Sequence, residues 1–339
     1  MKRPKGNRVL YFANIVFALL LLLFYATSFI SPKTFELGGL LNLFTPVIFI
    51  INMLFAVFWL VKLNRYVLIS LITLLLGWSH VRKFVKLSSS VQEESADFKI
   101  MSYNVMQFYS PTDKSKNTYK DIDAFITKVK PDIIGIQEYT NSLDAKFLGY
   151  KYKVQNGKYE KLKTVILSKH KIIDHKLYEF VSNNSGLSAD IVVDADTIRV
   201  FSVHFESLNL MTDLEEMDEK SLRRKYKRLK RVFPRQVDQF DLIKNDIINS
   251  PYPVVVCSDL NNTSLSYIYR KLLNLELKDS FLEKGCGYGK TFTLNSFPLR
   301  IDMVFTSNEL MVASFDNFEV KHSDHYPIMA SLKVKPSDK

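Results

Sequence analysis

The sequence predicts an α/β domain that is preceded by an all-α membrane segment of three helices. Long uncharged runs fill the first part of the chain, short β-rich runs alternate with helical stretches in the remainder, and polar residues follow several β-rich runs. Strands buried by outer helices are the fold class that such alternation favours. The 339 residues therefore divide into a membrane segment over 1–86, a linker over 87–97 and a soluble domain over 98–337.

The membrane segment contains three apolar runs, at residues 9–30, 40–61 and 66–81. A helix of about 20 apolar residues spans a bilayer, so the first two runs are long enough and the third is shorter. A secretory signal peptide is the alternative for the first run. Its uncharged core of about 22 residues exceeds the roughly 7–15 of a signal peptide, and residues 29–34 show no clear small-x-small cleavage pattern. We therefore expect a retained anchor.

Basic residues in the short flanks predict the orientation, because such residues tend to stay on the cytoplasmic side. Four of them precede the first run, whereas the first loop holds only Lys33 against Glu36. The N-terminus is then cytoplasmic, and a third span carries the soluble domain to the extracytoplasmic side, although three basic residues at 82–86 oppose this placement. If residues 66–81 lie in the membrane interface instead, the domain is cytoplasmic.

The soluble domain needs no disulfide framework, since about 240 residues can bury a sizeable core. Its two cysteines, Cys257 and Cys286, are too few for such a framework and lack metal-site spacing. Cys257 ends an apolar run, and we expect it to be a buried, inert thiol.

Basic charge is concentrated in one segment of this domain. Residues 1–96 hold 10 Lys/Arg and 3 Asp/Glu, which leaves 36 Lys/Arg and 32 Asp/Glu for residues 97–339. Within the latter part, residues 220–235 alone contain nine basic residues and no acid. We predict that Arg224, Lys227 and Arg231 bind substrate. The segment would act as a basic flap over a phosphate-bearing substrate or a lipid surface.

A solvated helix face is the alternative for the basic segment. Acids in residues 213–219 could pair with it, whereas Pro234 indicates a helix break and a loop that could move. Only Tyr226 and Phe233 interrupt its polar residues with aromatic rings, so the segment lacks the aromatic stripe on which single-stranded bases stack.

Six short runs rich in Val, Ile, Phe or Met are the predicted strands of the soluble domain. They cover residues 99–105, 132–137, 164–167, 197–205, 254–258 and 301–306. Candidate helices lie between several of them, at residues 118–129 and 236–248. No internal repeat interrupts this order, which is that of an α/β domain.

The polar residues that follow these runs are of the types needed to hold a divalent cation, polarise a phosphate and activate a water. They are Asn104, Glu138, His204, Asp259 with Asn261, Asp302, and Asp324 with His325. Strand ends at one rim of a sheet can converge on a cleft, so residues far apart in sequence can form one site. One such residue alone is ordinarily a turn or solvated residue. Several in this order indicate metal-assisted phosphoester hydrolysis.

The order of seven short stretches resembles the endonuclease/exonuclease/phosphatase superfamily. The stretches are SYNV (102–105), DIIGIQE (132–138), VILSK (165–169), VHFES (203–207), SDLN (258–261), RIDMVF (300–305) and SDHYP (323–327), and they cover about 225 residues. The resemblance implies a two-sheet α/β sandwich with outer helices.

The resemblance also implies a role for each polar residue. Glu138 would be the principal Mg²⁺ ligand, with Asn104 beside it touching metal or phosphate and Mn²⁺ as the alternative ion. Asp259 and Asn261 match the pair that orients the attacking water and the phosphoryl oxygens.

The remaining roles concern proton transfer and substrate binding. His325 would be the catalytic histidine, held in tautomer and orientation by Asp302. Asp324 would complete a metal site or assist the base, and His204 would contact phosphate or the leaving group. Arg300, which opens the sixth stretch, is expected to bind substrate together with the basic segment.

The implied function is hydrolysis of a phosphoester by in-line water attack without a covalent intermediate. Nucleic acid and a phospholipid or other small phosphoester are both open as substrates, the bilayer is the expected partner of the membrane segment, and no protein partner can be inferred. Ser258 stands where the family usually has glycine, which could alter the cleft slightly. A non-catalytic anion-binding module is the remaining alternative, and the presence of Glu138, Asp259 and His325 argues against it.

Overall fold

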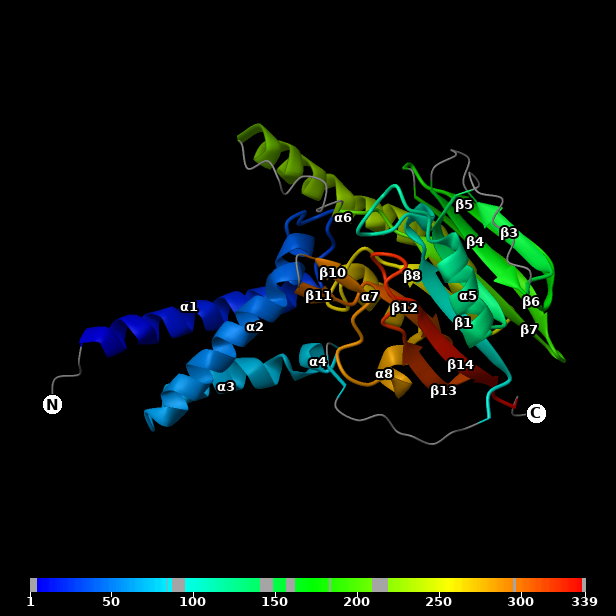
Figure 1. Cartoon of the computed structure of the whole chain (residues 1–339). Helices are drawn as coiled ribbons and strands as arrows, with labels where there is room; N and C mark the ends of the chain where they lie inside the picture. Colours follow the sequence, from blue (N-terminus) through cyan, green and yellow to red (C-terminus); the bar gives the residue numbers. More distant parts are fainter. Residues whose placement is uncertain are drawn as a thin grey trace.

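Figure 1 shows the computed structural model of the chain, in which two stacked β-sheets with outer helices follow a bundle of N-terminal helices. The structure describes residues 5–83, 85–86, 95–140, 149–156, 162–182, 184–208, 219–294 and 297–336. The predicted two-sheet α/β sandwich is confirmed. Most of the predicted linker falls on residues 87–94, outside this described part.

The N-terminal bundle consists of α1 (Lys5–Thr27), α2 (Gly38–Val61), α3 (Val67–Leu76) and the short α4 (Trp78–Val81). Among the described helices, α1 and α2 are long and apolar enough to span a membrane, whereas α3 has only 10 residues. Three full spans are therefore not confirmed. The third apolar run folds as α3 and α4 with a break at Gly77, where an added Cβ would lie 1.9 Å from the Tyr25 ring.

Polar side chains join the helices of this bundle. Ser70 of α3 donates a hydrogen bond to Asn14 of α1 over 2.6 Å. Asn52 of α2 donates to the Phe17 carbonyl of α1 over 2.9 Å. Such bonds between helices are favourable where the surroundings are apolar. The outward faces of the helices carry exposed apolar side chains, including Val16, Leu54 and Ile72.

The first sheet has the strand order β13-β14-β1-β2-β4-β3. Its strands are β1 (Phe98–Asn104), β2 (Ile133–Tyr139), β3 (Tyr152–Asn156), β4 (Lys163–Ser168), β13 (Leu310–Asn317) and β14 (Ile328–Val334). β1 and β2 are parallel, and the other pairs are antiparallel. Helix α5 (Tyr119–Val129) packs on the outer face through Ile122 and Ile126.

The second sheet has the strand order β5-β6-β7-β8-β12-β9. Its strands are β5 (Lys171–Glu179), β6 (Ser185–Val193), β7 (Asp196–His204), β8 (Val254–Asp259), β9 (Lys278–Asp279) and β12 (Asp302–Thr306). Helices α6 (Glu219–Ile248) and α7 (Tyr267–Leu273) cover its outer face. The smaller elements are η1 (Met106–Phe108), α8 (Ser280–Lys284), β10 (Phe292–Leu294) and β11 (Phe297–Leu299).

The main core lies between the two sheets, where Val, Ile and Leu side chains of both inner faces interdigitate. The sheets approach most tightly at Gly135 of β2, because a Cβ there would lie 2.7 Å from the Cβ of Cys257 in β8. The Cys257 thiol is fully buried, and burial raises its pKa to about 12, which agrees with the expected inert thiol.

All six predicted strands are present, with ends that differ by one or two residues from the prediction. The predicted helix break at Pro234 is wrong, because α6 runs without interruption from Glu219 to Ile248 with Pro234 inside it. Apolar burial of Val232, Phe233 and Val237 on either side of the proline holds the helix together despite the missing donor. The acids at 213–218 lie outside the described residues.

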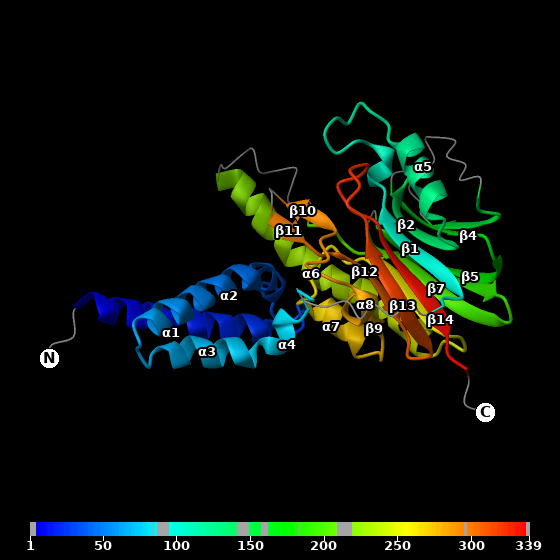
Figure 2. The same ribbon diagram turned by 60° about the horizontal axis from the view of Figure 1, so that its bottom comes forward.

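The domain-facing end of the bundle docks on α6 and α7. Phe233 of α6 packs against Leu40 of α2, and a Cβ on Gly39 would lie 2.3 Å from the Phe233 ring. Arg270 of α7 lies over the Phe29 ring at 3.9 Å. Both views show the bundle meeting the domain at this end, with the N-terminus at the far end (Figures 1 and 2).

Candidate active site

Four neighbouring strands end at one rim of the sandwich. β1 ends at Asn104, β2 carries Glu138 next to its last residue, and the parallel strands β7 and β8 end at His204 and Asp259. β12 runs antiparallel to β8 and begins at this rim with Asp302. His204, Asp259 and Asp302 are consecutive partners in the register of the second sheet. The register therefore fixes these three side chains side by side.

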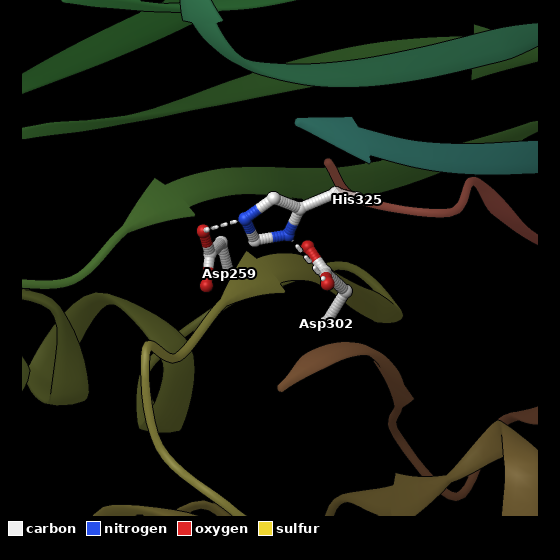
Figure 3. Close-up of side chains that lie close together, drawn as sticks. All are labelled: Asp259, Asp302 and His325. Carbon is white, nitrogen blue, oxygen red and sulfur yellow. Dashed lines mark hydrogen bonds and ion pairs between the residues drawn. The ribbon is translucent and has the colours of Figure 1, made fainter. Parts of the chain in front are cut away.

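A buried histidine joins the two aspartates of the rim, as Figure 3 shows. His325 Nδ1 lies 2.9 Å from Asp302 Oδ2, and His325 Nε2 lies 3.8 Å from Asp259 Oδ2. Burial disfavours the imidazolium, but the charges of Asp302 and Asp259 outweigh it and hold the pKa of His325 well above its ordinary value. The imidazole is therefore positively charged at neutral pH.

Hydroxyl groups fix the backbone around this histidine–aspartate pair. The backbone N–H groups of Ile301 and Asp302 both donate to Thr291 Oγ1 over 3.0 Å. Ser323 Oγ accepts from the His325 N–H over 3.2 Å and donates to the Asn104 carbonyl over 2.8 Å. The Ser323 bonds connect the His325 loop to the end of β1, a strand of the same sheet as β13 and β14.

Asn104 bridges two carboxylates of the rim. Its Nδ2 donates to Asp259 Oδ2 over 2.9 Å, and it also hydrogen-bonds Glu138. Glu138 has a positive φ of 52°, an uncommon conformation for a residue other than glycine. This turn of the backbone lets a residue near the end of β2 stay at the rim, where its side chain is partly exposed.

The rim carries more negative charge than its histidines neutralise. Burial, followed by the charge of Asp302, raises the pKa of Asp259 to about 6. Burial and the nearby charge of Asp324 raise the pKa of Glu138 despite its hydrogen bonds from Asn104 and Gln107. Burial and neighbouring carboxylates thus raise both pKa values more than His325 lowers them, and a bound cation would supply further positive charge. The donor set therefore fits a hard divalent cation.

Two positions at the rim could hold such a cation. Ligand atoms of Asp259, Asp302 and His325 lie within 4.8 Å of one another. The short bond between His325 and Asp302 uses one ligand atom of each, however, so this trio fits a hydrogen-bonded network better than a metal site. The carboxylates of Glu138 and Asp324 are partly exposed, and their oxygens suit a hard cation.

His204 lies at the centre of the rim with its Nε2 unpaired. This atom is buried without a hydrogen-bond partner in the described part of the chain, 3.7 Å from Glu138 Oε1 and 3.6 Å from Asp259 Oδ2. Burial lowers the pKa of His204, so the ring is neutral near pH 7. An unpaired neutral imidazole between two carboxylates can donate a hydrogen bond to a phosphate oxygen or a water.

Asn261 and Asp324 lie beside this cluster. The backbone N–H of Asn261 donates to Asp259 Oδ1 over 2.8 Å, while its side-chain amide turns to the Phe205 carbonyl at 3.0 Å. Asp324 is partly exposed and accepts from Ser323 Oγ over 3.3 Å. Ser258, the departure from the family pattern, is buried and its hydroxyl bonds to the Met303 carbonyl over 3.4 Å.

The position of Arg300 does not support its predicted role in substrate binding. Its side chain is buried, with Nη1 2.7 Å from Asp279 Oδ2 and Nη2 donating to the Lys83 carbonyl over 3.1 Å. Tyr269 shares the same Asp279 oxygen at 2.7 Å. Arg300 thus ties the segment after α4 to the domain instead of facing the rim.

The basic segment lies on α6 rather than at the rim. Lys227 and Arg231 are exposed on the first half of this helix, and Arg231 Nε bonds to the Lys227 carbonyl. Arg224 also belongs to this segment, but its side chain is not among those that the structure describes.

Sequence reasoning missed the positioning groups Thr291, Ser323 and Gln107. Ser323 stood inside the stretch that ends in His325, so its place beside the histidine was the signal that could have found it. Thr291 lies more than ten residues before Asp302 and follows no strand-end pattern. Phe292 was also missed, although its ring lies 4.9 Å from that of His325.

Comparison with protein families divides the chain at the same place as its fold. Residues 101–325 match the model described as the endonuclease/exonuclease/phosphatase family. Residues 7–84 match a model described as a domain of unknown function. A search of curated proteins found no match.

Solved structures share the fold at low sequence identity. An endonuclease/exonuclease/phosphatase from Beutenbergia cavernae is 14% identical with a TM-score of 0.53, covering 71% of this chain and 72% of that one. TDP2 from D. rerio in complex with a single-strand DNA product is 13% identical with a TM-score of 0.52, covering 70% and 99%. A mannosyl-6-phosphatase from Bacteroides thetaiotaomicron is 17% identical with a TM-score of 0.51, covering 69% and 99%.

The family model spans well over half of the chain and includes the rim residues from Asn104 to His325. The fold of these solved structures agrees with that match. The chain therefore belongs to the endonuclease/exonuclease/phosphatase family and is a phosphoester hydrolase.

Proposed function

We propose that this chain is a membrane-anchored, Mg²⁺-dependent phosphodiesterase or phosphatase that hydrolyses its substrate by in-line attack of water. The observation that carries the proposal is the convergence of Glu138, Asp259 and the His325–Asp302 pair on one rim. A binding module would need cationic groups for a phosphate, but it would not need carboxylates with raised pKa values beside them.

The residues that would hold the cation are Glu138 and Asn104, with Asp324 nearby. Carboxylate and amide oxygens suit Mg²⁺, and Mn²⁺ is the alternative. When bound, such an ion polarises the phosphoryl group and neutralises charge that develops on its oxygens.

The chain's own residues bind the substrate and handle the proton. Asp259, whose pKa lies near 6, orients the attacking water and accepts its proton, while the Asn261 N–H holds its other oxygen in place. The charged imidazole of His325 and the neutral Nε2 of His204 donate to the equatorial phosphoryl oxygens. Asp302 keeps His325 oriented and charged.

A nuclease is one reading of the substrate class. TDP2, which shares this fold, was solved with a single-strand DNA product. At 13% sequence identity the shared fold alone does not assign that substrate to this chain.

A phosphoester held at the bilayer is the second reading, and one feature of the site favours it. Leu208, four residues beyond His204, packs against Phe233 of α6 and Leu40 of α2. The catalytic strand β7 therefore leads directly to the bundle that anchors the domain. A lipid headgroup or a small phosphoester at the membrane surface would lie close to the rim.

Hydrolysis by the full chain in detergent micelles tests the proposal. The panel contains plasmid DNA, RNA, sphingomyelin, inositol phosphates and bis-p-nitrophenyl phosphate, each with Mg²⁺ and with EDTA. We expect EDTA-sensitive turnover of one substrate class that is lost in His325→Ala and retained in His175→Ala, an exposed histidine on β5. No turnover of any substrate by a folded protein would favour the anion-binding module.

A further inference from the structure

The first half of α6 presents a line of basic side chains to solvent. Arg223, Lys227 and Arg231 recur every four residues and therefore lie on one face of the helix, and all three are exposed. Tyr226, 47% exposed, lies next to this line, with Lys230 Nζ 5.1 Å from its ring centre. We call these three basic residues together with Tyr226 the basic stripe.

Charge pairs fix the height of α6 against the membrane helices. Lys33 and Glu36 are the only charged residues between Arg8 and Lys62, so the bilayer boundary on the domain side must lie at the loop that contains them. Lys33 pairs with Asp238 over 2.7 Å, and Glu36 pairs with Lys230 over 3.1 Å.

The basic stripe consequently begins at the level of the lipid headgroups. Lys230, which pairs with the boundary loop, is the residue next to Arg231. The distance along the helix axis from Arg231 to Arg223 is about 12 Å, which is close to one Debye length of roughly 8–10 Å at physiological salt. In both views the first half of α6 extends from the domain toward the side on which α1 to α3 lie (Figures 1 and 2).

The opposite face of α6 explains why the stripe is available. Val232, Phe233 and Val237 are buried against the bundle and the second sheet, so the helix cannot rotate the stripe inward. A tyrosine among lysines and arginines is also the composition found where proteins meet headgroups.

We propose that the basic stripe binds the anionic lipid headgroups of the leaflet on the domain side, and thereby holds the catalytic rim at the membrane surface. The inference rests on the membrane anchoring in the proposed function, but it does not depend on catalysis. Nucleic acid is the competing polyanion. The direct pairing of α6 with the boundary loop favours lipid, because any membrane-inserted state brings the stripe to the headgroups.

A fluorescent probe on α6 tests this contact in the full chain. Cys286→Ser removes the exposed thiol and Cys257 is buried, so a probe at Tyr226→Cys labels one site. The protein is reconstituted in nanodiscs that contain a headgroup-spin-labelled phosphatidylcholine quencher, with or without phosphatidylglycerol. We expect quenching about twofold stronger with the anionic lipid, and loss of this difference in high salt.

Paired variants separate the stripe from general charge. Lys227→Gln with Arg231→Gln should abolish the lipid-dependent quenching. Lys128→Gln with Lys171→Gln removes two exposed basic residues from α5 and β5 and should leave it unchanged. All quenching measurements are made in EDTA, so they do not depend on hydrolysis. Absence of hydrolysis in the separate assay with Mg²⁺, together with intact quenching, would reject the proposed function and keep this inference.

Three results would overturn the inference. Equal quenching in neutral and anionic nanodiscs would show that the stripe does not bind the lipid charge. Failure of the chain to co-elute with nanodiscs would remove its membrane basis. The third result is binding of a DNA oligonucleotide that requires the stripe residues, together with equal quenching in both lipid compositions. This result would assign the stripe to nucleic acid.

Discussion

At the residue scale, the rim holds two buried histidines, one positively charged and one neutral. Burial disfavours the charged form of both rings. His325 bonds directly to Asp302 and remains charged, whereas His204 reaches its carboxylates only at 3.6 and 3.7 Å and remains neutral. A charged donor and a neutral donor thus face the same space, which suits a substrate whose charge increases during the reaction.

The imidazole of His325 should be needed for turnover. We expect His325→Ala to lower kcat by about 10²- to 10⁴-fold, because the variant removes a charged donor. It should also lower the melting temperature, because it leaves the buried Asp302 carboxylate without its partner. His175→Ala is the matched control, since it removes an exposed histidine. Steady-state kinetics and thermal unfolding measure the two effects, and a wild-type rate in His325→Ala would reject the assigned role.

The raised pKa of Asp259 predicts how stability depends on pH. Its pKa is about 6 in the folded chain against an ordinary 3.8, so the folded state binds more protons between these values. The free energy of unfolding of the metal-free protein should therefore fall by up to about 3 kcal/mol as pH rises from 4 to 7, and should recover as pH falls again. Thermal unfolding in EDTA should show this slope in the wild type and not in Asp259→Asn. Parallel profiles would contradict the prediction.

The site residues that sequence reasoning brought together share a position at strand ends. Asn104, His204 and Asp259 follow apolar runs, and parallel strand ends meet at one rim. Arg300 belonged to the same stretch as Asp302 but turns toward Asp279 instead, since its direction depends on a tertiary partner. No local pattern distinguishes a buried arginine that pairs with an aspartate from one that binds phosphate.

At the element scale, six strands were predicted from their apolar runs, whereas the edge strands and the interior strands β6 and β14 were not. β2 and β8 are nearly continuous apolar runs because both of their faces are covered. β5 exposes most of its residues at the edge of the second sheet, so its composition is that of a loop. Pro234 misled the prediction of α6 because packing against the bundle and the second sheet outweighs the local cost of a proline.

Arg300, held by Asp279 of the second sheet, donates to the Lys83 carbonyl after α4, so this ion pair tests the junction between the N-terminal bundle and the domain. Arg300→Met should leave Asp279 as a buried, unpaired charge and cost about 3–5 kcal/mol of stability. Arg199→Met is a matched control, because Arg199 pairs with Asp190 at 2.7 Å in a more exposed position and should cost less. Thermal unfolding of the full chain in detergent compares them.

Adding Asp279→Asn to Arg300→Met separates charge from packing. The double variant removes the buried charge and should recover part of the lost stability. A single Arg300→Met variant as stable as the wild type would show that the junction does not depend on this pair.

At the scale of the whole molecule, the bundle and the domain meet at one end only. α1 runs toward the domain, α2 runs away from it, and α3 and α4 return to it, where the Lys83 carbonyl accepts from Arg300 and Ser264 (Figure 1). The N-terminus and the loop at 62–66 lie at the opposite end. If α1 and α2 cross the bilayer, these two ends lie on opposite sides of it.

Thiol labelling in intact cells tests this topology. Basic residues at the N-terminus and in the loop at 62–66 predict that the far end is cytoplasmic, which puts the domain outside. A membrane-impermeant maleimide should therefore label the exposed Cys286 in the wild type, and should label Lys62→Cys with Cys286→Ser only after permeabilisation. Labelling of both thiols from the same side would show that α3 and α4 do not cross. The reversed pattern would put the candidate active site in the cytoplasm and favour an intracellular nucleic acid as substrate. The expected pattern favours a phosphoester at the extracytoplasmic surface of the membrane.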